Sequence, residues 1–125
     1  MNWIKVSGIL GFLGVGIGAF GAHALKTRIS PEMLEVFRIG TLYHSLHAGV
    51  LLCVSFYGRN ARVNIQFGAI CFTLGILLFS GSLYALAITG IKSLGAITPF
   101  GGLCFLTGWA WITFKLGAKT NSQKI

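Results

Sequence analysis

Apolar residues fill four long stretches of the chain, and charged residues fall only before, between and after them. The ranges 6–25, 39–58, 63–91 and 93–114 contain no Asp, Glu, Lys or Arg. A helix needs about 20 mostly apolar residues to cross roughly 30 Å of hydrocarbon, and none of these ranges shows the polar face of a soluble amphipathic helix. The pattern predicts an all-α protein, an integral membrane four-helix bundle with short loops and both termini on the same side.

Charges and capping signals predict where the helices begin and end. Ser30-Pro31 and Thr98-Pro99 each place an N-cap residue before a proline, which is typical of a helix start. Trp109 and Trp111 lie toward the far end of the last span, where interfacial aromatic residues are expected. We predict one membrane domain of residues 1–125, with spans at about 5–25, 39–58, 65–90 and 96–114, an amphipathic start of the second helix at 30–38 and a mobile basic tail at 115–125.

The composition excludes several classes of protein. Of the 125 residues, 54% are hydrophobic and 10% are charged, against about 25% charged in a typical soluble domain. An ordinary soluble enzyme, a disordered chain and a disulfide-rich secreted module are therefore ruled out. The net charge of +8 faces lipid headgroups, so we expect the lipid bilayer as a partner. We expect no nucleic-acid partner, because no basic patch is interleaved with exposed aromatic residues.

The distribution of Lys and Arg predicts the orientation. With four spans, both termini share a side with the 59–62 loop, and that side carries more positive residues than the other. The positive-inside rule then places both termini in the cytoplasm or its equivalent. The residues on that side are Lys5, Arg59, Arg62, Lys115, Lys119 and Lys124, against Lys26, Arg28, Arg38 and Lys92 on the opposite side.

The first span also imitates a secretory signal. Ala22-His23-Ala24 has the A-x-A form of a cleavage site. However, the apolar run is longer than the usual core of a signal peptide, so we predict a retained span. The alternative, cleavage, predicts a mature N-terminus at Leu25.

Small residues form a stripe along the first span. Its members recur at steps of three and four residues, which places them on one helix face, and such stripes let helix backbones approach closely in lipid. The partner is either another span or a second copy of the chain. Gly16, Gly18 and Gly21 also match a dinucleotide-binding pattern, which we reject because no strand precedes it. The helix-packing stripe comprises Ser7, Gly11, Gly14, Gly18 and Ala22.

Polar side chains inside the spans are the candidates for a binding site. Counted from the span ends, they gather in the half of the bilayer next to the 26–38 and 92 loops. Ionisable groups in a membrane are costly and mark functional candidates, although histidines can also simply hydrogen-bond across helices. We expect hydrogen bonds from His44 and His47 to the serines, the tyrosine or the backbone. The cluster comprises His23, His44, His47, Tyr43, Ser80, Ser82, Tyr84 and Thr98.

These residues give little support to a metal site, a cofactor site or a catalytic site. His44 and His47 lie three apart on one helix face and could share one metal ion, since imidazole suits zinc, copper and haem iron. A haem would instead take its ligands from two helices, for example His47 and either His23 or a residue of a second copy. No acidic or cysteine ligand completes the site at that depth, so we predict no metal and no cofactor. Ser80 or Ser82 beside His47 is the only nucleophile–base pair, and no third group orients it. We therefore predict no catalytic residue and no enzyme.

Several motifs carry a family resemblance across nearly the whole chain. They resemble the domain of unknown function 423 family, small four-span membrane proteins of bacteria and mitochondria. The resemblance implies an inner (plasma) membrane location, or a mitochondrial membrane in a eukaryote, and brings no activity or catalytic residue. Ala24 departs from the glycine expected there. The motifs are GAFGAHALK (18–26), YHSLHA (43–48), LFSGSLYAL (78–86), ITPFGG (97–102) and GW (108–109).

Three classes of function follow. We favour a structural or accessory subunit that packs through its glycine stripe with itself or a larger membrane complex. The alternative is a small transporter, channel or lipid-handling protein with a polar pocket in one leaflet, which requires a water-accessible cavity reaching the histidines. The third class is a haem- or metal-binding redox protein or an enzyme.

Overall fold

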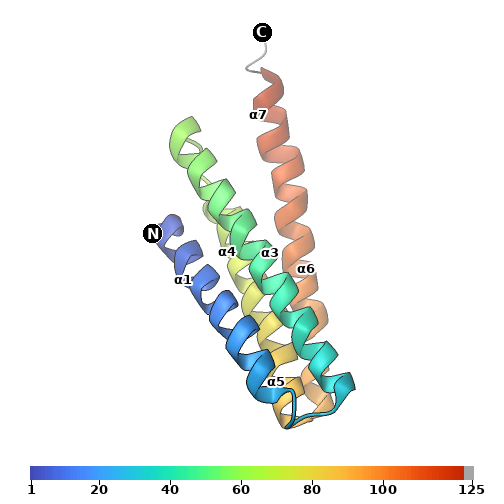
Figure 1. Cartoon of the computed structure of the whole chain (residues 1–125). Helices are drawn as coiled ribbons and strands as arrows, with labels where there is room; N and C mark the ends of the chain where they lie inside the picture. Colours follow the sequence, from blue (N-terminus) through green and yellow to red (C-terminus); the bar gives the residue numbers. More distant parts are fainter. Residues whose placement is uncertain (123–125) are drawn as a thin grey trace.

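The computed structural model describes residues 1–122, with side chains through residue 119, and it confirms the four-helix membrane fold. Four helices are long and apolar enough to span a membrane, and the described residues contain no strand (Figure 1). The N-terminus and α7 lie at the same end of the bundle. The first helix joins α1 (Trp3–Gly16), a π-helical turn η1 (Ile17–Gly21) and α2 (Ala22–Leu25), and the second is α3 (Pro31–Ala61).

The third and fourth helices are connected by a tight turn. Gly90 closes the third helix with a positive φ of 70°, a conformation that glycine adopts without steric cost. The third helix joins α4 (Gln66–Gly75), the π-helical turn η2 (Ile76–Ser80) and α5 (Gly81–Thr89). The fourth joins a 3₁₀ turn η3 (Lys92–Ala96), α6 (Thr98–Trp111), the π-helical turn η4 (Ile112–Leu116) and α7 (Gly117–Ser122).

Two predicted helix starts have different outcomes. The Ser30 hydroxyl accepts a hydrogen bond from the Met33 N–H at 3.2 Å, and Pro31 opens α3. Thr98, in contrast, is already the first residue of α6 and makes no cap hydrogen bond, because its hydroxyl is paired with Ser82 at 2.6 Å. The segment from residue 115, expected as a mobile tail, continues as helix to Ser122, and residues 123–125 lie outside the described part.

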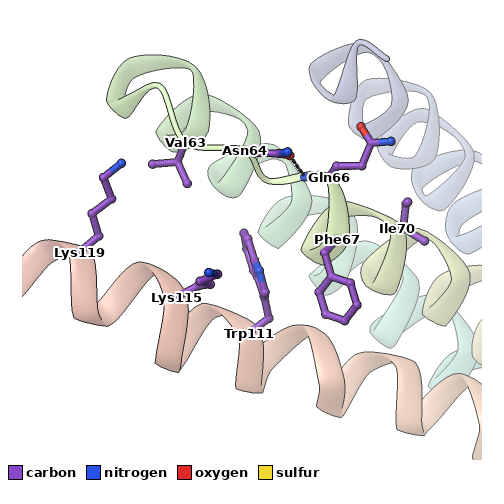
Figure 2. Close-up of a pocket in the computed structure, with 8 residues that line it drawn as sticks. All are labelled: Val63, Asn64, Gln66, Phe67, Ile70, Trp111, Lys115 and Lys119. Carbon is purple, nitrogen blue, oxygen red and sulfur yellow. Dashed lines mark hydrogen bonds between the residues drawn. The ribbon is translucent and has the colours of Figure 1, made fainter.

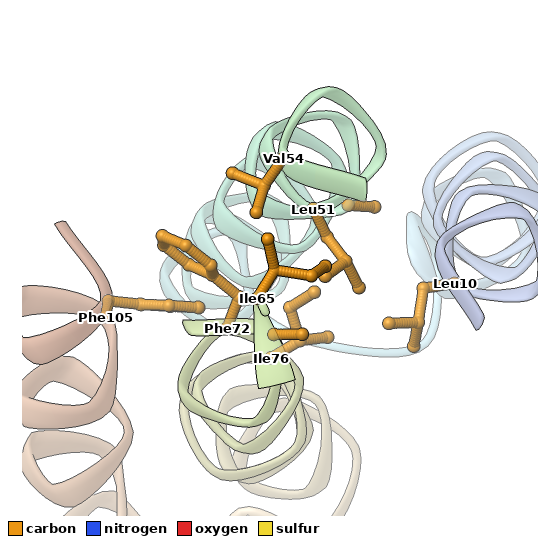
Figure 3. Packing of buried hydrophobic residues seen from close by; sticks show 9 residues of the cluster. Leu10, Leu51, Val54, Ile65, Phe72, Ile76 and Phe105 are labelled. Atoms are coloured by element: carbon orange, nitrogen blue, oxygen red, sulfur yellow. The ribbon is translucent and has the colours of Figure 1, made fainter. Parts of the chain in front are cut away.

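The helices form two packed pairs around a central contact. The first helix packs along α3, and α6 packs along α4 and η2, while α3 also contacts α5 and η2. Seen end-on, α3 and α4 lie at the centre, and Leu10 and Phe105 point inward from opposite sides (Figure 3). These two side chains enclose a core that includes Leu51, Phe72 and Ile76, each at most 2% exposed.

Glycine and aromatic residues alternate along the contact between the third and fourth helices. Each glycine leaves room for an aromatic residue of the opposite helix, and Figure 2 shows Trp111 reaching toward the start of α4 in this way. A Cβ on any of these glycines would overlap its partner, so the close approach depends on their missing side chains. We call this contact the glycine–aromatic ladder, and its pairs are Gly68–Trp111, Phe72–Gly108, Gly75–Phe105 and Phe79–Gly101.

Candidate functional site

The candidate site is a hydrogen-bonded network centred on α3. His44 and His47 lie near the middle of this helix, roughly 20 and 24 Å from Pro31 at 1.5 Å per residue. Each side chain is only 3% exposed. Buried polar groups in a membrane need partners within the protein, and both histidines have two.

His44 connects three helices. One ring nitrogen, Nε2, lies 2.7 Å from the backbone oxygen of Leu10 in α1, and the other, Nδ1, lies 2.8 Å from the Tyr84 hydroxyl in α5. Gly14 lies beside this contact: a Cβ there would make an ordinary contact with Cδ2 of His44 at 3.4 Å and a tight one with Oγ of Ser45 at 3.1 Å. The stripe on the first helix thus packs directly against the part of α3 that carries His44.

Gly40 plays the matching role for Tyr84. A Cβ at Gly40 would lie 2.9 Å from the tyrosine ring, so the ring passes over α3 at this glycine and reaches His44 one turn further along. Ser80, one turn from Tyr84 and fully buried, donates its hydroxyl to the Gly40 oxygen at 2.7 Å. Two hydrogen bonds one turn apart therefore join α3 to the third helix.

His47 connects α3 to α6. Its Nδ1 lies 2.8 Å from the Tyr43 backbone oxygen, and Nε1 of Trp109 donates to its Nε2 at 3.1 Å. The imidazole also stacks on the Phe105 ring, with ring centroids 3.6 Å apart and an angle of 10° between the planes. Trp109, which the sequence places toward the far end of the last span, thus finds in His47 the acceptor that its indole N–H needs.

The remaining predicted residues are distributed differently from the expected single cluster. Ser82 pairs with Thr98 at 2.6 Å and with the Phe79 backbone oxygen at 2.9 Å, so neither Ser80 nor Ser82 is bonded to a histidine. Tyr43 contributes its backbone oxygen to His47, while its ring packs on Phe79. His23 is exposed near the end of the first helix.

The predicted stripe on the first helix packs against α3, although not with all its members. Ser7 and Gly14 are buried, and a Cβ on Gly18 would contact Thr41 of α3 at 3.7 Å. Gly11 was placed in the stripe, but a Cβ there would meet no described atom within 4 Å. Leu10 occupies the buried position instead and joins the core. Ala22 is half-buried near the end of the helix.

The partners assign the two imidazoles opposite tautomers. Nδ1 of His47 donates to a carbonyl and Nε2 accepts from Trp109, whereas Nε2 of His44 donates to a carbonyl and Nδ1 accepts from Tyr84. A metal or haem iron could bind either ring only by displacing one of these hydrogen bonds. Among the described residues, no three His, Cys, Asp or Glu side chains gather where they could hold a metal ion.

Comparison with known proteins places this chain in a family. The family described as "Protein of unknown function (DUF423)" matches residues 17–102. The chain belongs to this family. Among curated proteins, it is 41% identical to a UPF0382 membrane protein of Staphylococcus saprophyticus in an alignment 120 residues long, which covers 90% of this chain and 100% of the relative. It is also 41% identical to the UPF0382 membrane protein YwdK of Bacillus subtilis in an alignment 112 residues long, which covers 88% of this chain and 91% of the relative.

The match confirms the family resemblance read from the motifs. The relatives are named membrane proteins, in agreement with an integral membrane protein of this fold. No solved structure matches the chain. The DUF423 range includes both central histidines, Ser80 and Tyr84, whereas Leu10 and Trp109 lie outside it.

Sequence reasoning on this DUF423 protein missed Trp109, Gly40 and Phe105. Trp109 lies in a Gly-Trp motif that the sequence analysis noted, but its position near the end of an apolar run favoured an interfacial reading. Gly40 precedes His44 by one turn, which is the spacing at which an aromatic side chain can pass over a helix to reach a polar group. That spacing is the signal that could have found it.

Proposed function

We propose that this DUF423 protein is a structural or accessory subunit of a membrane assembly, which packs with a second copy or with a helix of a larger complex. The observation that carries the proposal is a groove of about 310 Å³ on the outer face of the α1–α3 pair. Gly8, Gly11 and Gly49 lie in this groove, and a Cβ on any of them would meet no described atom within 4 Å.

A groove of this kind suits a helix. Gly14 and Gly18 lie on the face of the first helix that contacts α3. Gly8 and Gly11 lie where a Cβ would meet no described atom within 4 Å, and they leave a second surface of this helix open. Small residues let helices in lipid pack closely through van der Waals contacts. The flanking Phe12, with 79% of its surface exposed, would rest on the incoming helix.

The polar network supports a structural role over transport or catalysis. Transport requires water to reach His44 and His47, yet each side chain is only 3% exposed and all four ring nitrogens have partners. The surface pocket of about 600 Å³ that His47 lines is otherwise mainly apolar, with Phe79, Phe105 and Leu106 in its wall. An acyl-transfer mechanism requires a serine beside a histidine, yet Ser80 bonds to the Gly40 oxygen instead. These features support a packing role for the polar network.

The test is self-association of the full chain in lipid vesicles, measured by energy transfer between donor- and acceptor-labelled copies. We expect wild type to associate, and we expect the double variant Gly8→Leu/Gly11→Leu to lose at least about tenfold in affinity because the groove is filled. Gly16→Leu is the matched control, since a Cβ at Gly16 also meets open space but lies outside the groove.

If wild type does not self-associate, the larger-complex form is tested by native gel electrophoresis of solubilised source membranes. The groove variant should then shift the chain to a smaller assembly and the control should not. Wild type that migrates as a single chain in both experiments, or a control that behaves like the groove variant, refutes the proposal.

A further inference from the structure

A second surface feature lies at the opposite side of the bundle, where the turn between α3 and α4 meets the fourth helix. The pocket there has a volume of about 680 Å³. Figure 2 shows Trp111, Lys115 and Lys119 at successive turns of the fourth helix, facing Asn64 on the turn and Phe67 on α4. One end of the pocket is thus basic and polar, and the other is apolar.

The position of the pocket matches the boundary between hydrocarbon and water. Lys115 directly follows the uncharged range 93–114, and Asn64 lies at the beginning of the uncharged range 63–91. Phe67 and Ile70, which are 57% and 40% exposed, continue the pocket toward the apolar part of the bundle. A molecule that fills it would have a polar group at the surface and an apolar chain below.

The charge of this end favours an anion. The two acidic side chains of the sequence, Glu32 and Glu35, lie at the beginning of α3, roughly 40 Å along that helix from the pocket end at 1.5 Å per residue. That distance is several times the Debye length of about 8 Å at physiological salt. Both glutamates therefore lie far from Lys115.

The first turn of α4 adds to this preference. Its N-terminus lines the pocket at Gln66, whose backbone N–H bonds to Oδ1 of Asn64 at 3.0 Å. The helix has no acidic residue in its first turn, so the positive end of its dipole favours an anion. Lysines from one helix and a helix N-terminus from another thus face the same pocket.

We propose that this pocket binds one anionic phospholipid, with its phosphate between Lys115, Lys119 and the first turn of α4, and with an acyl chain along Phe67 and Ile70. The Trp111 ring forms the wall between these parts. This ligand fits both halves of the pocket, whereas free phosphate would use only the basic half. The proposal is independent of the groove between α1 and α3.

The experiment measures binding of phosphatidylglycerol and phosphatidylcholine with identical acyl chains to the purified full chain, by native mass spectrometry in mild detergent. We expect wild type to bind the first phosphatidylglycerol more tightly. The variant Lys115→Gln/Lys119→Gln should lose at least about fivefold in affinity for phosphatidylglycerol, since each lysine near the headgroups contributes to anionic lipid binding, and its affinity for phosphatidylcholine should not change.

Two further variants separate the pocket from total charge. Lys26→Gln/Lys92→Gln removes the same two charges at the other end of the bundle and should keep the wild-type preference. Lys115→Arg/Lys119→Arg keeps the charge at the pocket and should also keep the wild-type preference for phosphatidylglycerol. Far-UV circular dichroism checks that each variant retains its helices.

Three outcomes would overturn the proposal. The lipid preference could survive in Lys115→Gln/Lys119→Gln, or it could fall equally in the Lys26→Gln/Lys92→Gln control, which would assign it to net charge. Alternatively, inorganic phosphate in excess could displace the lipid from wild type as effectively as phosphatidylglycerol does, which would assign the pocket to a soluble anion.

Discussion

The glycine–aromatic ladder predicts that two adjacent glycines have opposite tolerance to the same substitution. A Cβ at Gly101 would overlap the backbone nitrogen of Phe79 and lie 2.7 Å from its Cα, whereas a Cβ at Gly102 would meet only the Phe79 ring, at 3.9 Å. Backbone atoms cannot move aside as a flexible side chain does. Gly101→Ala must therefore push α6 away from η2, and Gly102→Ala need not.

The size of the effect follows from the geometry. Ordinary van der Waals contact begins at 3.4 Å, so the helices must separate by roughly 1 Å, and a gap of that size forfeits a quarter to a half of the local dispersion energy. It also stretches the Ser82–Thr98 bond, 2.6 Å at present, to the limit of hydrogen bonding. Overpacking typically costs about 1–3 kcal/mol, and the lost bond adds about 0.6 kcal/mol.

The assay is unfolding of the full chain by sodium dodecyl sulfate in mixed micelles, followed by circular dichroism. Both variants gain the same helix propensity from alanine, so that contribution cancels in their comparison. We expect Gly101→Ala to have a free energy of unfolding about 2 kcal/mol below that of Gly102→Ala. Equal free energies would refute the reasoning, because they would show that α6 and η2 separate without loss.

The polar network yields three further predictions. Tyr84→Phe should lower the free energy of unfolding by about 0.6 kcal/mol, and by at most about 1.7 kcal/mol, and a double-mutant cycle should show that His44→Ala abolishes this loss. Ser80→Ala should cost a similar amount, while Thr107→Ala should cost less, because the Thr107 hydroxyl is exposed and bonds to its own helix. Nitrogen-15 spectra of labelled side chains should show an Nδ1–H tautomer for His47 and an Nε2–H tautomer for His44, and identical tautomers would contradict the assigned partners.

The four helices could be predicted because the membrane makes their signal strong. A charge-free run of about 20 residues has few alternatives to a spanning helix, and the Ser30-Pro31 start depends only on local chemistry. The sequence also singled out His44 and Tyr84 as polar residues at comparable depth. Their mutual hydrogen bond was one of several open pairings, because depth alone does not say which faces of two helices meet.

The pairings that could not be predicted depend on the rotation and register of neighbouring helices. From the sequence alone, Trp109 has the position of an interfacial tryptophan. Only the rotation of α6 in the structure shows that its N–H donates to Nε2 of His47. The serines were equally plausible partners for the histidines, and their hydroxyls instead bond to the Gly40 oxygen and Thr98. Uncharged helices in lipid carry little amphipathic pattern from which such rotation can be inferred.

The register between the third and fourth helices, however, can be inferred from the sequence once the position of the turn is known. In each pair of the glycine–aromatic ladder, and in the Ser82–Thr98 pair, the two residues are equally far from Gly90 along the sequence to within one residue. A tight turn at a glycine with positive φ fixes how far one helix has advanced when the other begins. Glycines and aromatic residues that mirror each other across such a turn, at steps of three and four, then indicate an antiparallel pair in close contact. The alternation therefore determines the α4–α6 packing, and the histidine network determines how α3 joins that pair.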